Sequence, residues 1–280
     1  MEGTQASQAR LTVAMITEVF HDDPAGGRLQ ARLEEAGAVG AELAVLPELP
    51  LNSWCPATRN TADADAEPPG GPRQLTMSRA ARRAGVGLLG GAIVRDPTTG
   101  VRHNTALLYD RFGEQVAAYR KLHLPQEEGF WEASHYEAGT EPPKPTAAFA
   151  MPVGVQVCSD VNRPDGTLLL GVQGANAVFV PRATPPESYA RWRVVLQANA
   201  VTAAVYVLSV NRTDADSVVP IGGPSVAIAP DGEVMLETTD PVACVTLSSQ
   251  AVEAARQEYP GYLPVRAGLY ARAWAGIAGD

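Results

Sequence analysis

The sequence predicts an α/β fold with helices outside and sheets inside. Short runs of β-type residues alternate with longer helical patterns through the 280 residues. Several of the short runs are apolar on both faces, so they must be covered on both sides. The hydrophobic content of 45% is sufficient for one large core. We therefore expect a single domain over residues 1–280, built from stacked layers of helices and sheets.

The elements follow in order along the chain. Strands are expected over 11–16, 43–46, 86–94, 105–110, 153–158, 177–180, 205–210, 225–229 and 243–247. A further strand is expected to end at Arg120 and Lys121. Helices are expected over 24–38, 72–84, 165–175 and 187–203; the first opens with DDP and the third with PDG, and proline suits a helix start. Residues 56–72 and 139–146, rich in Pro and Gly, are expected to be loops and candidate lids.

Composition excludes several classes of function. The chain has 22 Lys and Arg against 31 Asp and Glu, and its net charge of −9 opposes a nucleic-acid partner. Neither a signal peptide nor an apolar run of about 18 residues is visible, so we expect a cytoplasmic protein with no membrane partner. The three cysteines, Cys55, Cys158 and Cys244, are too few and too scattered for a disulfide framework. The four histidines lack metal-ligand spacing, so no metal is expected.

Cys158 raises the main functional question. It ends the apolar run VGVQVC and is followed at once by Ser and Asp. Free cysteine is among the most buried residue types, so an inert core thiol is one interpretation. The other interpretation is a nucleophile, which needs a neighbouring base or cation because a free thiol has a pKa of about 8.5. His123 or His135 could serve in a cysteine–histidine pair, although nothing local requires it.

Two further strand ends carry the groups that could activate the thiol. An apolar strand stops just before Glu48, and another ends at Lys121. Ligand sites in α/β folds favour the carboxyl ends of strands. Glu48, Lys121 and Cys158 therefore form a plausible catalytic constellation.

At these residues the chain resembles the nitrilase superfamily of carbon-nitrogen hydrolases. The matching motifs are LPELPLNSW (46–54), YRKLHLP (119–125) and VQVCSDVNRPD (155–165), with a fourth likeness over 209–233. Their order and spacing agree, and the likeness covers about residues 10–247. It implies a four-layer αββα sandwich, no metal or organic cofactor, and a homodimer or higher homo-oligomer. In that assembly residues 248–280 would be a C-terminal extension that packs between subunits.

The resemblance also assigns roles to residues. It implies that Glu48 is the general base, Lys121 the oxyanion stabiliser and Cys158 the nucleophile. The second glutamate that the family places after the lysine motif best matches Glu132 in GFWEASHYEAG. Glu127 and Glu128 are nearby alternatives.

Departures from the family pattern bear on the substrate. Ser159 stands where the family usually has Trp or Tyr. Arg182 stands where the family has Thr or Ser, and its guanidinium is expected to leave a strand end beside Cys158 and hold a carboxylate. Trp54 and Trp131 lie beside the proposed site, and for each of them core packing is as good an interpretation as substrate contact.

The predicted function is a thiol hydrolase that cleaves a non-peptide C–N bond of a small molecule. The reaction passes through a thioester on Cys158 and releases ammonia or an amine. The interval from YRKLHLP to GFWEASHYEAG looks most like the N-carbamoyl amine group of the family, which favours an N-carbamoyl amine, a ureido acid or an amide. Nitrile hydrolysis, acyl transfer to an amine and a catalytically dead metabolite-binding relative stay open as alternatives.

Overall fold

Two β-sheets form the centre of the molecule, in a computed structural model that describes residues 8–213 and 218–277. The larger sheet has seven strands, ordered β14 (Val242–Ser248), β1 (Arg10–Ile16), β2 (Leu43–Val45), β4 (Gly87–Arg95), β5 (Arg102–Tyr109) and β6 (Gln115–Arg120), with β3 (Ala66–Glu67) also beside β4. The second sheet has five, ordered β13 (Val234–Thr238), β12 (Ser225–Ile228), β11 (Tyr206–Asn211), β10 (Ala177–Arg182) and β9 (Val153–Val155). A short ribbon pairs β7 (Gln126–Glu127) with β8 (Phe130–Trp131).

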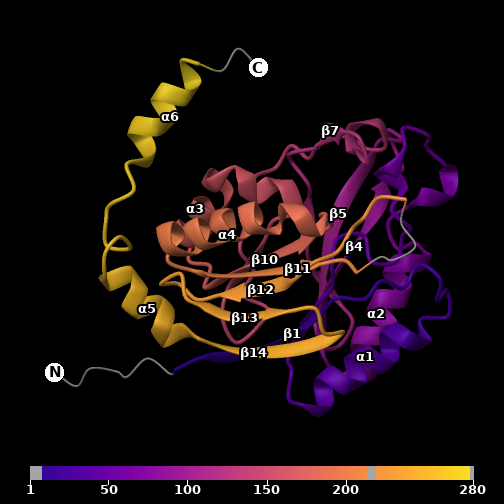
Figure 1. The fold of residues 1–280 in the computed structure, drawn as a ribbon, viewed down its shortest axis with the longest axis horizontal. Helices are drawn as coiled ribbons and strands as arrows, with labels where there is room; N and C mark the ends of the chain where they lie inside the picture. The colour runs from indigo at the N-terminus through magenta and orange to yellow at the C-terminus, as the bar shows by residue number, and fades with distance from the viewer. Residues whose placement is uncertain (1–7, 214–217, 278–280) are drawn as a thin grey trace.

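Helices cover the outer face of each sheet (Figure 1). Helices α1 (Gly27–Ala38) and α2 (Pro72–Ala84) share one apolar cluster with the larger sheet, and α3 (Pro164–Val172) and α4 (Tyr189–Ala203) share another with the smaller sheet. A third cluster fills the space between the sheets, where Met15 of β1 and Phe179 of β10 are fully buried. The predicted four-layer αββα sandwich is confirmed.

Strand direction brings the predicted site residues to one region. Strands β1, β2 and β4 run parallel, and so do β9, β10 and β11. Strand β6 is antiparallel to β5, which is antiparallel to β4, so β6 ends at the same edge of the sheet as β2. All three residues of β2 and of β9 are buried, as expected for strands covered on both faces.

Some elements differ from the predicted ones. Strand β9 ends at Val155, and Cys158 opens a 3₁₀ turn, η4 (Cys158–Asn162), instead of closing the strand. Strand β13 was not among the predicted strands because it is an edge strand that alternates half-buried and exposed residues and so lacks an apolar run. Helix α5 (Ser249–Gln257) was also not predicted, yet it packs on the body with Val252 fully buried.

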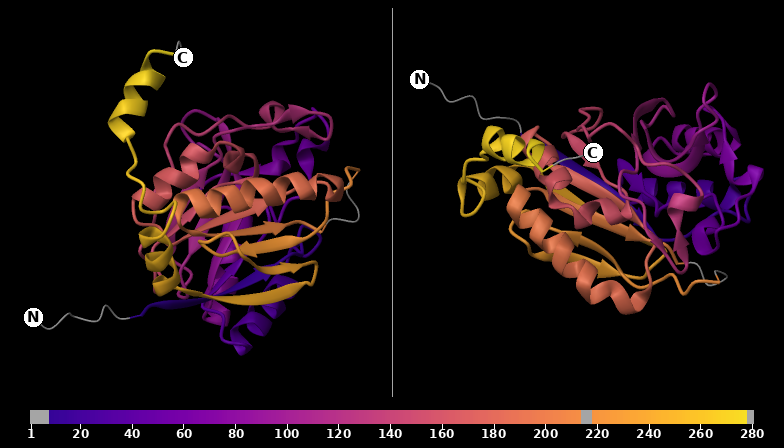
Figure 2. Two further views of the ribbon diagram at one scale, coloured as in Figure 1. Left: turned by 60° about the vertical axis from the view of Figure 1, so that its left-hand side comes forward. Right: turned by 90° about the horizontal axis from the view of Figure 1, so that it is seen from above.

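Residues 258–277 leave the body of the molecule. Their helix, α6 (Ala267–Ala275), projects away from both sheets (Figures 1 and 2). The large apolar side chains of this segment are exposed: Tyr259, Tyr262, Leu263, Val265, Leu269, Tyr270, Trp274 and Ile277. A single chain does not test the homodimer or the packing of this extension, which stay predictions. Within the described residues no helix has the length and apolarity to cross a membrane, and residues 1–7, used in the signal-peptide argument, lie outside them.

Candidate active site

Lys121 joins two carboxylates in the interior. Its Nζ donates to Glu48 Oε1 at 2.8 Å and to Glu132 Oε1 and Oε2 at 2.7 and 2.6 Å. Lys121 directly follows β6, and Glu48 lies three residues beyond β2, so one edge of the larger sheet supplies both. Glu132 opens the 3₁₀ turn η3 (Glu132–Ser134). All three side chains are almost fully buried, so they form an ion trio shielded from solvent.

The trio keeps a positive charge inside the protein. Burial acts to lower the pKa of Lys121, but the Glu132 and Glu48 carboxylates outweigh it and raise the pKa, so the ammonium stays charged. Burial raises the pKa of Glu132, while the Lys121 ammonium opposes this shift. Removing Lys121 would leave two buried carboxylates without compensation, which is the costly case for an interior ion pair.

Neutral side chains orient the two carboxylates. Asn104 Nδ2 donates to Glu48 Oε1 at 2.8 Å, and the Tyr136 hydroxyl donates to Glu132 Oε2 at 2.7 Å. The other oxygen of Glu48, Oε2, is buried and has no hydrogen-bond partner among the described residues. Glu48 therefore has one oxygen held in place and one with a free lone pair.

Cys158 is presented by a strained turn. Its φ of 47° lies in the left-handed region, which costs a residue with a Cβ roughly 1–3 kcal/mol and is found mostly at functional sites. Burial, and then the Glu48 carboxylate, raise the pKa of the Cys158 thiol, while the Lys121 ammonium opposes them. The thiol is therefore protonated at rest, and its attack on a substrate needs a base to take the proton.

Asp160 holds the nucleophile turn against the lysine loop. Its Oδ1 accepts from the backbone N–H groups of Leu122 and His123 at 3.1 and 2.8 Å. Its Oδ2 accepts from the Tyr119 hydroxyl at 2.9 Å and from Val157 N at 3.1 Å. One buried carboxylate thus fixes the segments on both sides of Lys121 and Cys158. This role of Asp160 was not predicted, although the residue stands inside the VQVCSD motif.

A cavity of about 370 Å³ opens beside the thiol. Cys158 and Glu132 line it, while Glu48 and Lys121 are enclosed behind them. The rest of its described lining is Pro125, Glu127, Phe130, Ser159, Asn162, Ala183, Thr184, Pro185, Ser188, Arg191 and Trp192. It is large enough for a small molecule with a short side chain, in a partly apolar, partly polar setting.

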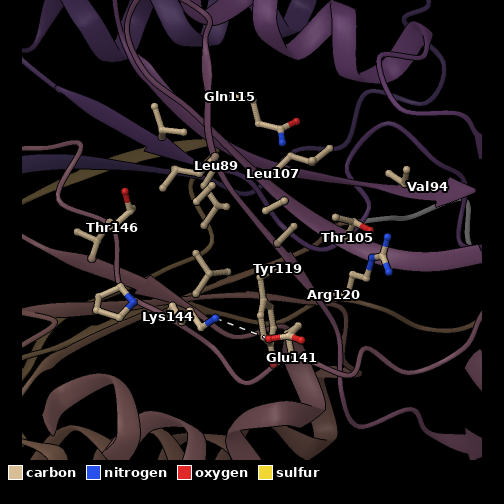
Figure 3. Close-up of a pocket in the computed structure, with 18 of the residues that line it drawn as sticks. Leu89, Val94, Thr105, Leu107, Gln115, Tyr119, Arg120, Glu141, Lys144 and Thr146 are labelled. Atoms are coloured by element: carbon tan, nitrogen blue, oxygen red, sulfur yellow. Dashed lines mark ion pairs between the residues drawn. The ribbon is translucent and has the colours of Figure 1, made fainter. Parts of the chain in front are cut away.

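A second cavity, of about 620 Å³, lies along β6 and contains none of the four proposed catalytic residues (Figure 3). Tyr119, Arg120 and an ion pair between Lys144 and Glu141 border it. The two predicted lids contribute here: the first supplies Pro69, and the second supplies Thr140, Glu141, Pro142, Lys144, Pro145 and Thr146. The lid prediction is therefore wrong for the site at Cys158, since neither loop is among the described residues that line that cavity.

The structure separates the predicted substrate-contact residues. Ser159 lines the cavity, but its hydroxyl donates to the His123 carbonyl. Trp54 is not among the described lining residues. It packs against Phe130, which does line the cavity, and its Nε1 donates to Gly129 O at 2.9 Å. Trp131 stacks under the Arg59 guanidinium at 3.8 Å and is not among the described lining residues.

The remaining alternatives can also be placed. Glu127 lines the cavity mouth but makes no contact with Lys121, and Glu128 is exposed, so Glu132 is the glutamate of the ion trio. Neither histidine offered for a cysteine–histidine pair is bonded to Cys158. His123 Nδ1 lies 3.0 Å from Asp160 Oδ1, and His135 Nε2 lies 2.7 Å from Thr58 O.

The expectation for Arg182 is wrong. The residue does end β10 near the cavity, but its side chain is fully buried and turns back into the smaller sheet. Its guanidinium donates to Ser209 Oγ at 3.0 Å, Thr184 Oγ1 at 2.5 Å and Pro224 O at 2.6 Å. Because these internal acceptors already engage its nitrogens, Arg182 supports the cavity wall instead of reaching a carboxylate in the cavity.

A comparison with known protein families identifies the family of the chain. A family model described as carbon-nitrogen hydrolase matches residues 7–257. The chain belongs to the carbon-nitrogen hydrolase family. The matched region contains the ion trio, Cys158 and the cavity, and it ends with helix α5, before the projecting segment.

Curated relatives of this carbon-nitrogen hydrolase include two amidases and a nitrilase homolog. It is 29% identical to omega-amidase NIT2 of Danio rerio over 246 residues, which cover 84% of this chain and 86% of that protein. It is 25% identical to N-carbamoylputrescine amidase of Arabidopsis thaliana, covering 85% of this chain and 86% of that one. With nitrilase homolog 2 of Dictyostelium discoideum the identity is 28%, over 85% and 74% of the two chains.

Solved structures show the same fold. A carbon-nitrogen hydrolase from Helicobacter pylori superposes with a TM-score of 0.81 at 17% identity, covering 95% of this chain and 98% of that one. Nit3 of Saccharomyces cerevisiae, described as a member of the nitrilase superfamily, gives a TM-score of 0.78 at 21% identity and covers 92% and 96% of the two chains. The resemblance to the nitrilase superfamily is confirmed. The chain is a carbon-nitrogen hydrolase by family, and the curated relatives named above include two amidases.

Proposed function

We propose that this carbon-nitrogen hydrolase cleaves an amide or N-carbamoyl C–N bond of a small molecule through a thioester on Cys158. The observation that carries the proposal is the buried trio of Glu48, Lys121 and Glu132 next to a strained, protonated thiol. A buried base, a fixed cation and a thiol beside a cavity that can admit a substrate are what acyl transfer through a covalent intermediate requires.

In the first half-reaction the thiol becomes the nucleophile. Glu48, through its unpartnered Oε2, takes the proton of Cys158 as the sulfur attacks the carbonyl carbon. The oxyanion that forms is stabilised by the Lys121 ammonium and by the backbone N–H of Ser159. When the C–N bond breaks, Glu48 returns the proton to the leaving nitrogen, which departs as ammonia or an amine.

In the second half-reaction water replaces the amine. Glu48 removes a proton from the water as its oxygen attacks the thioester, the C–S bond breaks, and the sulfur regains the proton. Glu132 stays hydrogen-bonded to Lys121 throughout and keeps the ammonium in position. If an amine entered in place of water, the same thioester would undergo acyl transfer.

Arg191 favours an acidic substrate, because it lines the cavity and Arg182 does not reach it. Arg191 lies in the first turn of α4 and is the one cationic side chain among the described residues that line the cavity. It is exposed, and no ion pair engages it within the described part of the chain. A guanidinium in this position can hold a carboxylate in bidentate fashion. We propose that the substrate carries a carboxylate, as a ureido acid or an ω-amide of a carboxylic acid does.

The reaction class can be tested with paired substrates. Each ureido acid, amide and nitrile would be offered in two forms, with and without its carboxylate, and products and protein adducts would be followed by mass spectrometry. We expect ammonia or amine release from the amide or N-carbamoyl compounds and an acyl adduct on Cys158. Turnover of nitriles alone, or product made only when an acceptor amine is added, would replace the proposal by one of the two alternatives. No turnover and no adduct with any compound would favour the catalytically dead relative.

Arg191→Ala tests the substrate charge. A carboxylate held equally in ground and transition states gives uniform binding, so the variant should raise KM for the carboxylate-bearing substrate by roughly tenfold and leave kcat unchanged. The uncharged partner substrate should be unaffected. Arg193→Ala is the matched control, because Arg193 lies on the same helix but points to Glu237 at 3.2 Å. Equal effects of Arg191→Ala on both substrates would remove the carboxylate from the proposal and leave the hydrolase intact.

A further inference from the structure

A second cluster of reactive side chains lies outside the hydrolytic machinery. The ligand atoms of Cys55, Asp65 and His135 all lie within 4.8 Å of one another. They come from three separate segments: Cys55 opens the 3₁₀ turn η1 (Cys55–Ala57), Asp65 closes η2 (Asp63–Asp65), and His135 follows η3. None of them has a part in the steps at Cys158, and their separation explains why no metal-ligand spacing is visible in the sequence.

His135 is arranged as metal-bound histidines are. It is 4% exposed, and its Nε2 lies 2.7 Å from Thr58 O, so Nε2 carries the hydrogen and Nδ1 has the lone pair. Nδ1 is buried and has no hydrogen-bond partner among the described residues. A buried nitrogen left in this state costs free energy unless something binds it. Metal-bound histidines commonly donate one ring N–H to a carbonyl while the other nitrogen binds the ion.

The three side chains are close to one another but are not bonded to one another. No hydrogen bond joins Cys55, Asp65 or His135 to another member of the cluster, although the three are so close. Asp65 Oδ2 accepts from Ala62 N at 3.0 Å, which leaves the second carboxylate oxygen available. A tetrahedral zinc ion with bonds of about 2.0–2.3 Å holds its ligand atoms roughly 3.3–3.8 Å apart. Movements of about 1 Å would therefore close this cluster around an ion.

Charge in the cluster favours a cation. A bound divalent cation deprotonates a coordinating thiol. A thiolate and a carboxylate together would neutralise two positive charges.

We propose that Cys55, Asp65 and His135 bind one Zn²⁺ ion, with water as the fourth ligand. Thiolate, imidazole and carboxylate are the ligand types of zinc, whereas Mg²⁺ and Ca²⁺ select oxygen ligands. The ion would tie the loop that carries η1 and η2 to the residue that follows η3, the turn that bears Glu132. The hydrolytic steps proposed at Cys158 do not use this ion.

Metal binding by the Cys158→Ala protein tests the proposal, since that variant cannot bind the ion through the nucleophile. The full-length variant, stripped with a chelator, would be titrated with Zn²⁺ and separately with Co²⁺, whose thiolate charge-transfer band reports sulfur ligation. We expect one Zn²⁺ per chain and a thiolate band with Co²⁺. Adding Cys55→Ser should abolish the band, and adding Cys244→Ser, which removes an exposed thiol, should leave it unchanged.

Thermal unfolding distinguishes the loss of a metal-binding side chain from a general loss of stability. In the presence of chelator, the Cys158→Ala protein with and without Cys55→Ser should melt at the same temperature, and Zn²⁺ should raise only the melting temperature of the protein that keeps Cys55. Absence of stoichiometric Zn²⁺ binding by the Cys158→Ala protein would overturn the site. So would a Co²⁺ thiolate band that survives Cys55→Ser.

Discussion

Cys158→Ala is expected to abolish turnover of every substrate while the fold remains. The variant removes the only atom that can form the thioester, and loss of a nucleophile in comparable covalent enzymes costs roughly 10⁶-fold in kcat. The deleted sulfur is small, so the resulting cavity should lower the free energy of unfolding by about 1 kcal/mol. Steady-state kinetics and urea unfolding of the purified variant measure the two quantities.

Cys244→Ser is the control for this loss. Cys244 is an exposed thiol on β14, so its replacement should change neither kcat nor the adduct on Cys158. Residual activity of Cys158→Ala near the level of the unmodified enzyme would show that the reaction does not pass through a covalent intermediate on this residue. The proposed role of Glu48 as proton acceptor would then also lose its basis.

Lys121→Met should reduce both rate and stability. It removes the ammonium that stabilises the oxyanion, a loss of roughly 10²- to 10³-fold in kcat. It also leaves the Glu48 and Glu132 carboxylates buried without their cation, which typically costs about 3–5 kcal/mol in the free energy of unfolding. Lys144→Met is the control, because the Lys144 side chain is 70% exposed and its ion pair with Glu141 is a surface contact.

A double variant separates the two effects of this lysine. Lys121→Met combined with Glu132→Gln removes one of the stranded charges, so part of the stability should return while the rate stays low. Chemical unfolding and kcat would be measured on the single and double variants. An unchanged kcat in Lys121→Met would make the lysine a structural residue and leave the oxyanion to backbone donors.

The main catalytic residues could be predicted because they stand at strand ends within motifs. Glu48 and Lys121 follow strands that end at the same edge of the larger sheet, and Cys158 follows a strand of the smaller sheet, so the carboxyl ends of strands supply all three. The groups that orient them were harder to find. Asn104 lies within β5, and Tyr136 follows η3, so only the folded chain shows that each donates to a catalytic carboxylate. Strand β5 begins with four polar residues, Arg102, His103, Asn104 and Thr105, so its sequence does not single out Asn104.

Side-chain direction was the part that the sequence could not provide. Arg182 is at the strand end where it was expected, but successive side chains of a strand point to opposite faces, and the register decides which face meets the cavity. The Arg182 side chain points into the protein, toward Ser209, while the next two residues, Ala183 and Thr184, line the cavity. Arg191 reaches the same cavity from a helix that begins after a loop, and no strand pattern foretells that placement.

The catalytic groups come from two different sheets, so the active site forms only when both sheets have folded and packed together. Glu48 and Lys121 follow strands of the larger sheet, whereas Cys158 follows a strand of the smaller one. In a chain in which only one sheet has formed, the Cys158 thiol therefore lacks Glu48 and Lys121 as neighbours and is not activated. Hydrolysis can begin only after the two sheets have packed against each other. During biosynthesis the incomplete chain is thus harmless to amides around it. Recovery of activity after dilution from denaturant would report the packing of the two sheets against each other, which circular dichroism of the strands and helices does not measure.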